Sequence, residues 1–187
     1  MIIRKAKKED SKLIATFMML AMEDIVFQFI GECSDEKATQ FLTCLINQKA
    51  NQYSYNNCWV VESDAEIIAA ANVYDGAKLE ELRMPVAELI KLMFNRDFSP
   101  EDETCAGEFY VDCVGVNTVW QGKGVGSKLF DFLIDEYVHK RKKTLGLLVD
   151  NNNPKAKKLY LKLGFEITGE KILTGKKMIH LQFKNNN

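Results

Sequence analysis

The sequence predicts an α/β (α+β) fold, and three observations support this prediction. The 187 residues suit one compact domain, or one domain with an insertion. Short apolar segments typical of strands alternate along the chain with longer segments of helical periodicity. A glycine-rich run, 121–126, joins the strand-like segment Val111–Val116 to a helical pattern that begins near Val125. We therefore expect a sheet covered by helices, in a single domain over residues 1–187.

In the first half of the chain, the pattern predicts three strands, two long helices and a helical insertion. The insertion spans about 76–106, where the strand pattern is interrupted, and we expect it to cover part of a site. Its helix is expected to begin at Pro85, because proline is tolerated in the first turn. The other expected elements are strand Ile2–Ala6, a helix with Asp10 or Ser11 as N-cap, a helix with Phe41, Leu42, Leu45 and Ile46 inward, and strands Asn57–Glu62 and Ile67–Tyr74.

In the second half, strands and helices alternate more regularly. The segment Thr144–Val149 is almost continuously apolar, as expected for a central strand. Gly164 is placed to end the last helix, because glycine favours the residue after a helix. The expected elements are strand Glu108–Val116, a helix from Gly124 to about Lys143, strand Thr144–Val149, helix Pro154–Leu163, and strands Phe165–Thr168 and Met178–Phe183.

The composition is that of a soluble globular protein, with 47% hydrophobic and 27% charged residues. No uncharged apolar run approaches the roughly 20 residues that span a bilayer. Charge returns at Arg4 and Lys5 without an apolar signal core, so we expect a cytoplasmic protein with no membrane partner. The five cysteines form no Cys-x-x-Cys pair and the chain has only two histidines, so neither a disulfide framework nor a metal site is expected.

The net charge of −1 is unevenly distributed. Residues 120–162 contain 10 Lys/Arg and 4 Asp/Glu, a local charge of +6, and the remaining 15 Lys/Arg and 22 Asp/Glu give −7. Residues 75–112 contain 4 basic and 10 acidic residues, a local charge of −6. Ordinary solvated faces would also produce such a pattern. The functional interpretation is a basic half for a polyanionic ligand and an acidic half for a cationic one.

The run 121–126, Gln-Gly-Lys-Gly-Val-Gly, has the form of an anion-binding turn. The first N–H groups of a helix lack partners inside the helix and can donate to a phosphate. Glycines let the backbone approach closely and adopt φ values that a Cβ would forbid. A well-capped strand-to-helix junction would also explain this run alone. A second signature begins 32 residues after Gln121 and makes the difference: Asn153, Ala156 and Tyr160, followed by Gly164-Phe165.

These two signatures, in this order, resemble those of the GNAT N-acetyltransferase superfamily, Gln/Arg-x-x-Gly-x-Gly/Ala and Asn-x-x-Ala-x-x-x-Tyr with a following Gly-Phe. The element order resembles the family over nearly the whole chain, although specific motifs occur only in residues 108–165. The resemblance implies a mixed, strongly curved central sheet with helices on both faces, whose fourth and fifth strands splay apart. It also implies acetyl-CoA as donor and a primary amine as acceptor. Family members often dimerise, so a homodimer is one expected assembly.

The resemblance also indicates which residues would bind acetyl-CoA. The backbone of Val114, Gly115 and Val116 would bond the pantetheine amides, as a strand added to a sheet edge. Lys123 and Lys157 would add positive charge near the phosphates. Gln121 and Asn153 belong to the two signatures, and Asn153 is also a favoured helix N-cap. The pyrophosphate would be held by the N–H groups of Gly122, Lys123, Gly124, Val125, Gly126 and Ser127.

Acetyl transfer to an amine needs a group that removes a proton from the amine and a group that protonates the leaving thiolate. For the acid, Tyr160 matches the family position that donates to the thiolate, although it also fits an ordinary apolar helical stripe. For the base, the strand offers Asp112 first and Glu108 second. Alternation places both on one face with Tyr110 and Val114. A structural bond from Asp112 to a neighbouring loop is the alternative, and many family members place the base elsewhere.

The acceptor pocket is expected to be built by residues 23–31, by Tyr53, Tyr55 and Trp59, and by the insertion. The acidic stretch predicts a cationic acceptor, which the sequence leaves open as a small molecule or a peptide amine. A non-catalytic acyl-CoA-binding sensor is the alternative function, and it would tolerate loss of the catalytic candidates. No nucleic-acid partner is expected, because the basic cluster 140–143 ends a helix, where cations suit the dipole, and has no interleaved aromatic residues.

Overall fold

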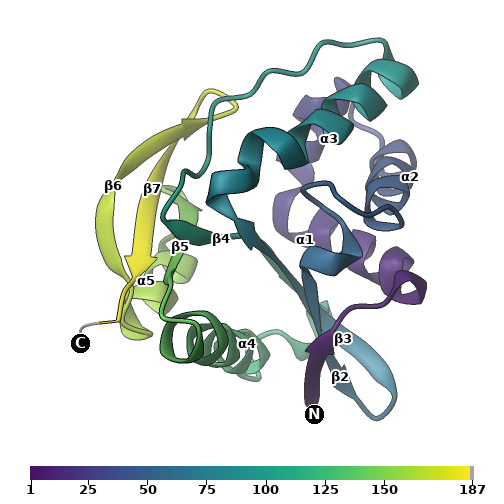
Figure 1. The fold of residues 1–187 in the computed structure, drawn as a ribbon. Coiled ribbons are helices and arrows are strands. Elements are labelled where there is room, and N and C mark those ends of the chain that lie inside the picture. The colour runs from purple at the N-terminus through teal and green to yellow at the C-terminus, as the bar shows by residue number, and fades with distance from the viewer. Residues whose placement is uncertain (186–187) are drawn as a thin grey trace.

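The computed structural model describes residues 1–185. The strands are β1 (Ile2–Lys5), β2 (Cys58–Ser63), β3 (Glu66–Asp75), β4 (Glu108–Val116), β5 (Thr144–Asp150), β6 (Glu166–Leu173) and β7 (Lys176–Phe183). The helices are α1 (Ser11–Ile30), α2 (Asp35–Ile46), α3 (Leu79–Phe94), α4 (Val125–Leu133), which continues as a π-helical segment (Ile134–Lys140), and α5 (Pro154–Lys162). The strands described form one mixed sheet in the order β1-β2-β3-β4-β5-β7-β6 (Figure 1).

Helices cover both faces of this sheet, as the sequence predicts. On one face, α1, α2 and α3 bury an apolar cluster that includes Ile14, Phe17 and Phe41. On the other face, α4 and α5 pack over a second cluster that includes Val111 and Leu129. Figure 1 shows α1, α2 and α3 grouped on one side and α4 on the other. The sheet is therefore the middle layer, and a ligand reaches its centre only where neighbouring strands part.

The fourth and fifth strands part as expected. β4 and β5 are the one parallel pair in the described sheet, and their pairing runs only from Glu108↔Thr144 to Val111↔Leu147. Beyond that point β4 continues to Val116 and β5 to Asp150 without a shared register. The N–H and C=O groups of β4 that point toward β5 beyond Val111 therefore have no strand partner, although they lie in the middle of the sheet.

A β-bulge lies at Asp112, where the splay begins. Val73 pairs with Val111 and Asn72 pairs with Cys113, so Asp112 has no partner on β3. The extra residue reverses the alternation of side chains. Val111 packs on the α4 side of the sheet, but Cys113 packs on the α1 side.

The prediction that Val114 shares a face with Glu108 and Tyr110 is therefore wrong. Val114 contacts the cluster under α4, whereas Tyr110 packs with Tyr74 on the opposite face. The physical reason is the bulge, since one unpaired residue shifts every later side chain to the other face.

One helix start differs from expectation, because Pro85 lies inside α3, which begins six residues earlier at Leu79. Asp10 occupies the N-cap position of α1 as expected, but its side chain makes no capping hydrogen bond, since it accepts from the Lys7 N–H at 2.7 Å and pairs with Arg4 at 2.8 Å. α3 lies between β3 and β4, within the segment 76–106 that we expected as an insertion.

One segment, Lys8–Ile30, is long and apolar enough by composition to cross a membrane. Its side chains at Ile14, Phe17 and Met18 are buried in the core, and a core helix passes the same test. Within residues 1–185 no group of three or more His, Cys, Asp or Glu side chains could hold a metal ion.

We expect the contact between α1 and β4 to be intolerant of any side chain at Gly115. A Cβ at this position would overlap the carbonyl oxygen and carbon of Phe17, which are backbone atoms. Gly115→Ala should lower the free energy of unfolding by about 1–3 kcal/mol, measured by urea denaturation. Gly169→Ala is the matched control, because nothing lies within 4 Å of a Cβ there. Equal stability of both variants would show that α1 does not press on β4 as described.

Candidate active site

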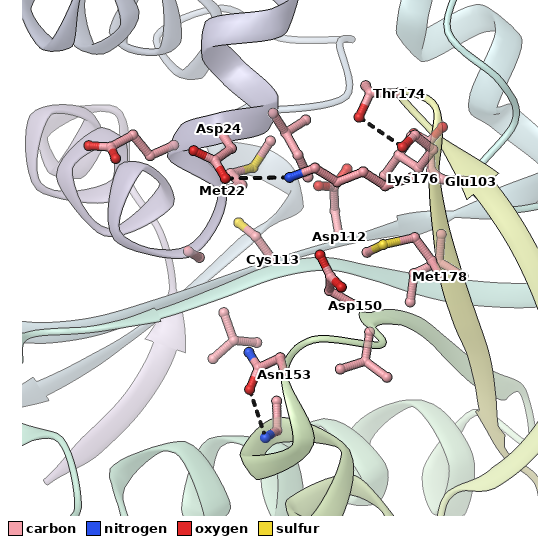
Figure 2. Close-up of a pocket in the computed structure, with 18 of the residues that line it drawn as sticks. Met22, Asp24, Glu103, Asp112, Cys113, Asp150, Asn153, Thr174, Lys176 and Met178 are labelled. Atoms are coloured by element: carbon pink, nitrogen blue, oxygen red, sulfur yellow. Dashed lines mark hydrogen bonds and ion pairs between the residues drawn. The ribbon is translucent and has the colours of Figure 1, made fainter. Parts of the chain in front are cut away.

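A cavity of about 540 Å³ lies where β4 and β5 separate (Figure 2). The segment 112–114 of β4 and the segment 148–150 of β5 form its floor, and α5 contributes Asn153, Ala156 and Tyr160. The turn between β6 and β7 and one part of α1 complete its walls. The cavity therefore joins the opened edge of the sheet to both helical layers.

A break in α1 shapes one wall of this cavity. Met22 has φ −144° and ψ 29°, which are not helical values, so α1 kinks at this residue. Residues 20–25 around the kink line the cavity, as does Phe29. Part of the segment 23–31, which the sequence assigns to the acceptor pocket, thus lines this cavity. Tyr53 also lines the cavity, whereas Tyr55 and Trp59 are absent from its lining, and the Trp59 indole donates to the Tyr137 hydroxyl at 3.0 Å beneath α4.

Asp112 is held in a polar network at the bulge. Gln52 Nε2 lies 2.9 Å from Asp112 Oδ2 and 2.7 Å from Glu103 Oε1. The Tyr74 hydroxyl donates to Glu103 Oε1 at 2.9 Å and lies 3.1 Å from Gln52 Nε2. Arg83 forms an ion pair with Glu103 from outside the cavity. The network fixes one Asp112 oxygen, and the half-buried side chain lines the cavity.

This environment raises the pKa of Asp112 to about 7. Burial is the largest cause, and the negative charge of Glu103 adds to it. Hydrogen bonds with Gln52 and Tyr74 and the charge of Arg83 oppose the rise. Both protonation states of Asp112 are therefore populated near neutral pH, which suits a group that accepts and returns a proton.

Glu108 occupies a different environment. It is buried, and it pairs with His180 Nε2 at 2.9 Å while accepting from Gln182 Nε2 at 2.7 Å and Thr104 Oγ1 at 2.7 Å. Burial alone would raise the pKa of Glu108, but hydrogen bonds, first from His180, bring it below its usual value. Glu108 does not line the cavity. Its geometry is that of a satisfied structural carboxylate.

Tyr160 enters the cavity from α5, opposite the network. Its ring packs edge-on against Phe130, with ring centroids 5.0 Å apart, and against Phe165 at 6.1 Å. Burial raises the pKa of Tyr160 to about 12, so the phenol keeps its proton across the physiological range. Asn153 caps α5 by accepting the Ala156 N–H at 3.1 Å, as the preference of asparagine for the N-cap position predicts.

The glycine-rich turn leads from β4 into α4. Gly122 and Gly124 adopt φ of 74° and 80°, values that disfavour any other residue. A Cβ at either of them would meet nothing within 4 Å, and at Gly126 it would meet only Val116 Cγ2 at 4.0 Å. The Gln121 side chain ties the turn to β4 by donating to the Val116 carbonyl at 3.1 Å.

The open cradle fits a diphosphate, because it pairs free space with the first N–H groups of α4. Lys123 is exposed, with its amino group 5.3 Å from the Trp120 ring centre, and Lys157 is half-buried in the first turns of α5. Val125 is buried under the sheet, so only its backbone is available to a ligand.

Sequence reasoning missed four members of the Asp112 network: Gln52, Tyr74, Arg83 and Glu103. Glu103 belongs to the acidic stretch that indicated a cationic ligand, and this charge pattern is the one signal that pointed to it. Gln52 lies in a polar loop and carries no comparable signal.

Comparison with known proteins places the chain in a family of known fold. The sequence profile of the Acetyltransferase (GNAT) family fits residues 22–165. An alpha-tubulin N-acetyltransferase of Phytophthora infestans is 35% identical over 75 residues, which make up 40% of this chain and only 39% of that relative. A crystal structure of an acetyltransferase has 29% identity and a TM-score of 0.82 over 98% of this chain and 99% of its own.

A fold relative has been solved with a bound ligand. The protein yncA from Salmonella typhimurium, solved with its cofactor acetyl-CoA, has 17% identity and a TM-score of 0.57 over 100% of this chain and 95% of its own. At this identity the likeness concerns the fold alone. The family match, which covers most of the chain, shows that this protein belongs to the Acetyltransferase (GNAT) family.

Proposed function

We propose that this protein moves an acetyl group from acetyl-CoA to a primary amine by direct attack, with Asp112 as general base and Tyr160 as general acid. The observation that carries the proposal is the placement of both groups on one cavity, at the point where β4 and β5 part. Bound acetyl-CoA supplies the thioester. The amine nitrogen forms the new bond to its carbonyl carbon, and the carbon–sulfur bond breaks.

The chain's own groups carry the protons of this reaction. A lysine-like amine has a pKa of about 10.4, so its neutral form costs roughly 4–5 kcal/mol near pH 7. Asp112, with its pKa about 7, accepts that proton directly or through a water. Tyr160, which stays protonated in the free protein, donates to the thiolate sulfur as it leaves. The nitrogen loses its second proton as the amide forms, and this proton returns through solvent to the Tyr160 phenolate. We assign the base to Asp112 and not to Glu108, because Glu108 is sequestered with His180.

The donor would be held by main-chain groups. The β4 edge beyond Val111 supplies N–H and C=O groups at Val114, Gly115 and Val116 for the pantetheine amides. The amides of residues 122–127 would hold the pyrophosphate, and Lys123 and Lys157 would lie near it. A non-catalytic sensor would need only these main-chain groups and lysines. The match to the acetyltransferase family, and the presence of both Asp112 and Tyr160 in the cavity, favour an enzyme over a sensor.

Three further features remain predictions from the sequence. They are a cytoplasmic location, the absence of nucleic-acid and membrane partners, and a homodimeric assembly. We also propose that the acceptor is a small-molecule or peptide amine.

Donor binding is tested by adding bulk to the cradle. At about 100 times its Kd, acetyl-CoA should stabilise the wild-type protein by roughly 2.7 kcal/mol, seen as a thermal shift. Gly126→Val should raise the Kd by about tenfold or more, because its side chain fills space that a phosphate needs. Gly169→Val, also in open space, is the control. No thermal shift with acetyl-CoA or coenzyme A in the wild-type protein would refute the proposed donor.

The base is tested by the pH dependence of kcat/KM. The wild-type rate should fall on the acid side with a midpoint near the Asp112 pKa of about 7, and Asp112→Asn should lose this limb together with about 10²–10⁴ in rate. Glu103→Gln should move the midpoint to lower pH, because it removes a negative charge that raises the Asp112 pKa. Glu108→Gln should leave the midpoint in place. A midpoint that follows Glu108 instead would overturn the assignment.

The acid is tested at Tyr160. Tyr160→Phe should lower kcat by about 10²-fold or more, because the thiolate then leaves without a proton donor. The Kd for acetyl-CoA, measured by calorimetry, should stay within about twofold, since the ring still packs on Phe130 and only the hydroxyl is lost. An unchanged kcat would return Tyr160 to a purely structural role.

A further inference from the structure

The lining of the cavity is strongly acidic. The inference drawn from this charge rests on the proposed function and concerns the amine that accepts the acetyl group. Among the charged side chains that line the cavity, one is basic, Lys176. Arg83 balances Glu103 from outside the cavity, which still leaves a clear excess of negative charge. The carboxylates of the lining are Glu23, Asp24, Glu103, Asp112 and Asp150.

Two of these carboxylates lie at different depths. Asp112 is half-buried on β4 and tied to Gln52, whereas Asp24 lies on the kinked part of α1 with 77% of its side chain exposed. Figure 2 shows the Lys176 side chain reaching from the start of β7 toward Asp24 on α1, whereas Asp112 comes from β4. The cavity thus has an inner carboxylate for a reacting amine and an outer carboxylate for a second charge.

The outer carboxylate already binds an ammonium group. Lys176 Nζ lies 3.4 Å from Asp24 Oδ2, and both side chains are well exposed. Exposed ion pairs of this kind add little to stability, so Lys176 can yield its place without loss of the fold. The pair shows that the position next to Asp24 has room for an ammonium and the charge to hold one.

The surrounding contacts favour a small ligand. The end of β6 and the turn after it bond to the segment 101–102, from the Thr174 N–H to Glu101 Oε2 at 3.0 Å and from Lys171 Nζ to the Asp102 carbonyl at 3.1 Å. Lys176, the first residue of β7, pairs with Asp24 on α1. Thr174 and Lys176 both line the cavity, so these contacts hold its wall in place, and a wall held in this way would obstruct the surface of a folded protein more than a flexible small amine.

We propose that the acceptor is a small amine that carries a second cationic group. The reacting amine lies toward Asp112, and the distal cation binds Asp24 in place of the Lys176 ammonium. Two opposite charges bound at separate carboxylates orient the chain of the acceptor, which places the reacting nitrogen at the thioester.

The test compares acceptors that differ by one charge. With the whole protein and acetyl-CoA, kcat/KM is measured for a series of α,ω-diaminoalkanes and for the 1-aminoalkanes of the same chain lengths. We expect the best diamine to exceed its monoamine by at least about tenfold at low salt, and this ratio to shrink when salt is raised from about 50 to about 500 mM. Asp24→Asn should reduce the ratio by at least about fivefold. Lys176→Met should lower the KM of the diamine, because the competing ammonium is gone.

Asp97→Asn is the matched control, since Asp97 is also an exposed carboxylate paired with a lysine, Lys91 at 3.0 Å, but lies outside the cavity lining. This variant should keep the wild-type ratio. Equal rates for monoamines and diamines, or an equal loss for both in Asp24→Asn, would overturn the inference while acetyl transfer to amines still stood. A lysine in a folded protein preferred over every diamine would overturn it as well. Failure to acetylate any amine, with diamine binding still dependent on Asp24 by calorimetry, would instead refute the proposed function and keep the cation subsite.

Discussion

The early end of hydrogen bonding between β4 and β5 is the constraint on which the rest of the structure depends. Pairing stops at Val111 and Leu147, and β4 then runs five residues further without its neighbour. A sheet interior normally has no free backbone groups, because each N–H and C=O bonds to the next strand. Here the missing partner leaves a row of such groups at the bottom of a cavity. The same separation admits α5 to one wall and the kinked part of α1 to another.

The bulge at Asp112 places a carboxylate at this opening. In a regular strand, Asp112 would bond to β3 and Val114 would lie on the same face. The extra residue instead leaves Asp112 unpaired and turns its side chain to the network of Gln52, Glu103 and Tyr74. The site therefore relies on burial and on the nearby Glu103 to keep the Asp112 pKa about 7. Glu108, four residues earlier on the same strand, shows the contrast, since His180 and two further donors hold it ionised in a closed pocket.

The sequence predicts the order of the elements, the glycine-rich turn before α4 and the position of Tyr160 on α5 because these are local properties. Periodicity, glycine placement and short spacings need no knowledge of distant residues. The bulge leaves no such mark, since the run from Glu108 to Val116 alternates well enough to pass for a regular strand. The partners of the two carboxylates come from far along the chain: Gln52 lies 60 residues before Asp112, and His180 lies 72 residues after Glu108. Only the assembled fold separates the carboxylate that faces the cavity from the one that is paired.

A crystal structure of the protein bound to coenzyme A tests the central claim most directly. The account predicts the pantetheine amides bonded to the main chain of β4 between Val114 and Val116, the diphosphate on the amides of residues 122–127, and the sulfur between Asp112 and Tyr160. Coenzyme bound elsewhere, or a sulfur remote from both side chains while the β4 edge bonds only to protein, would contradict it.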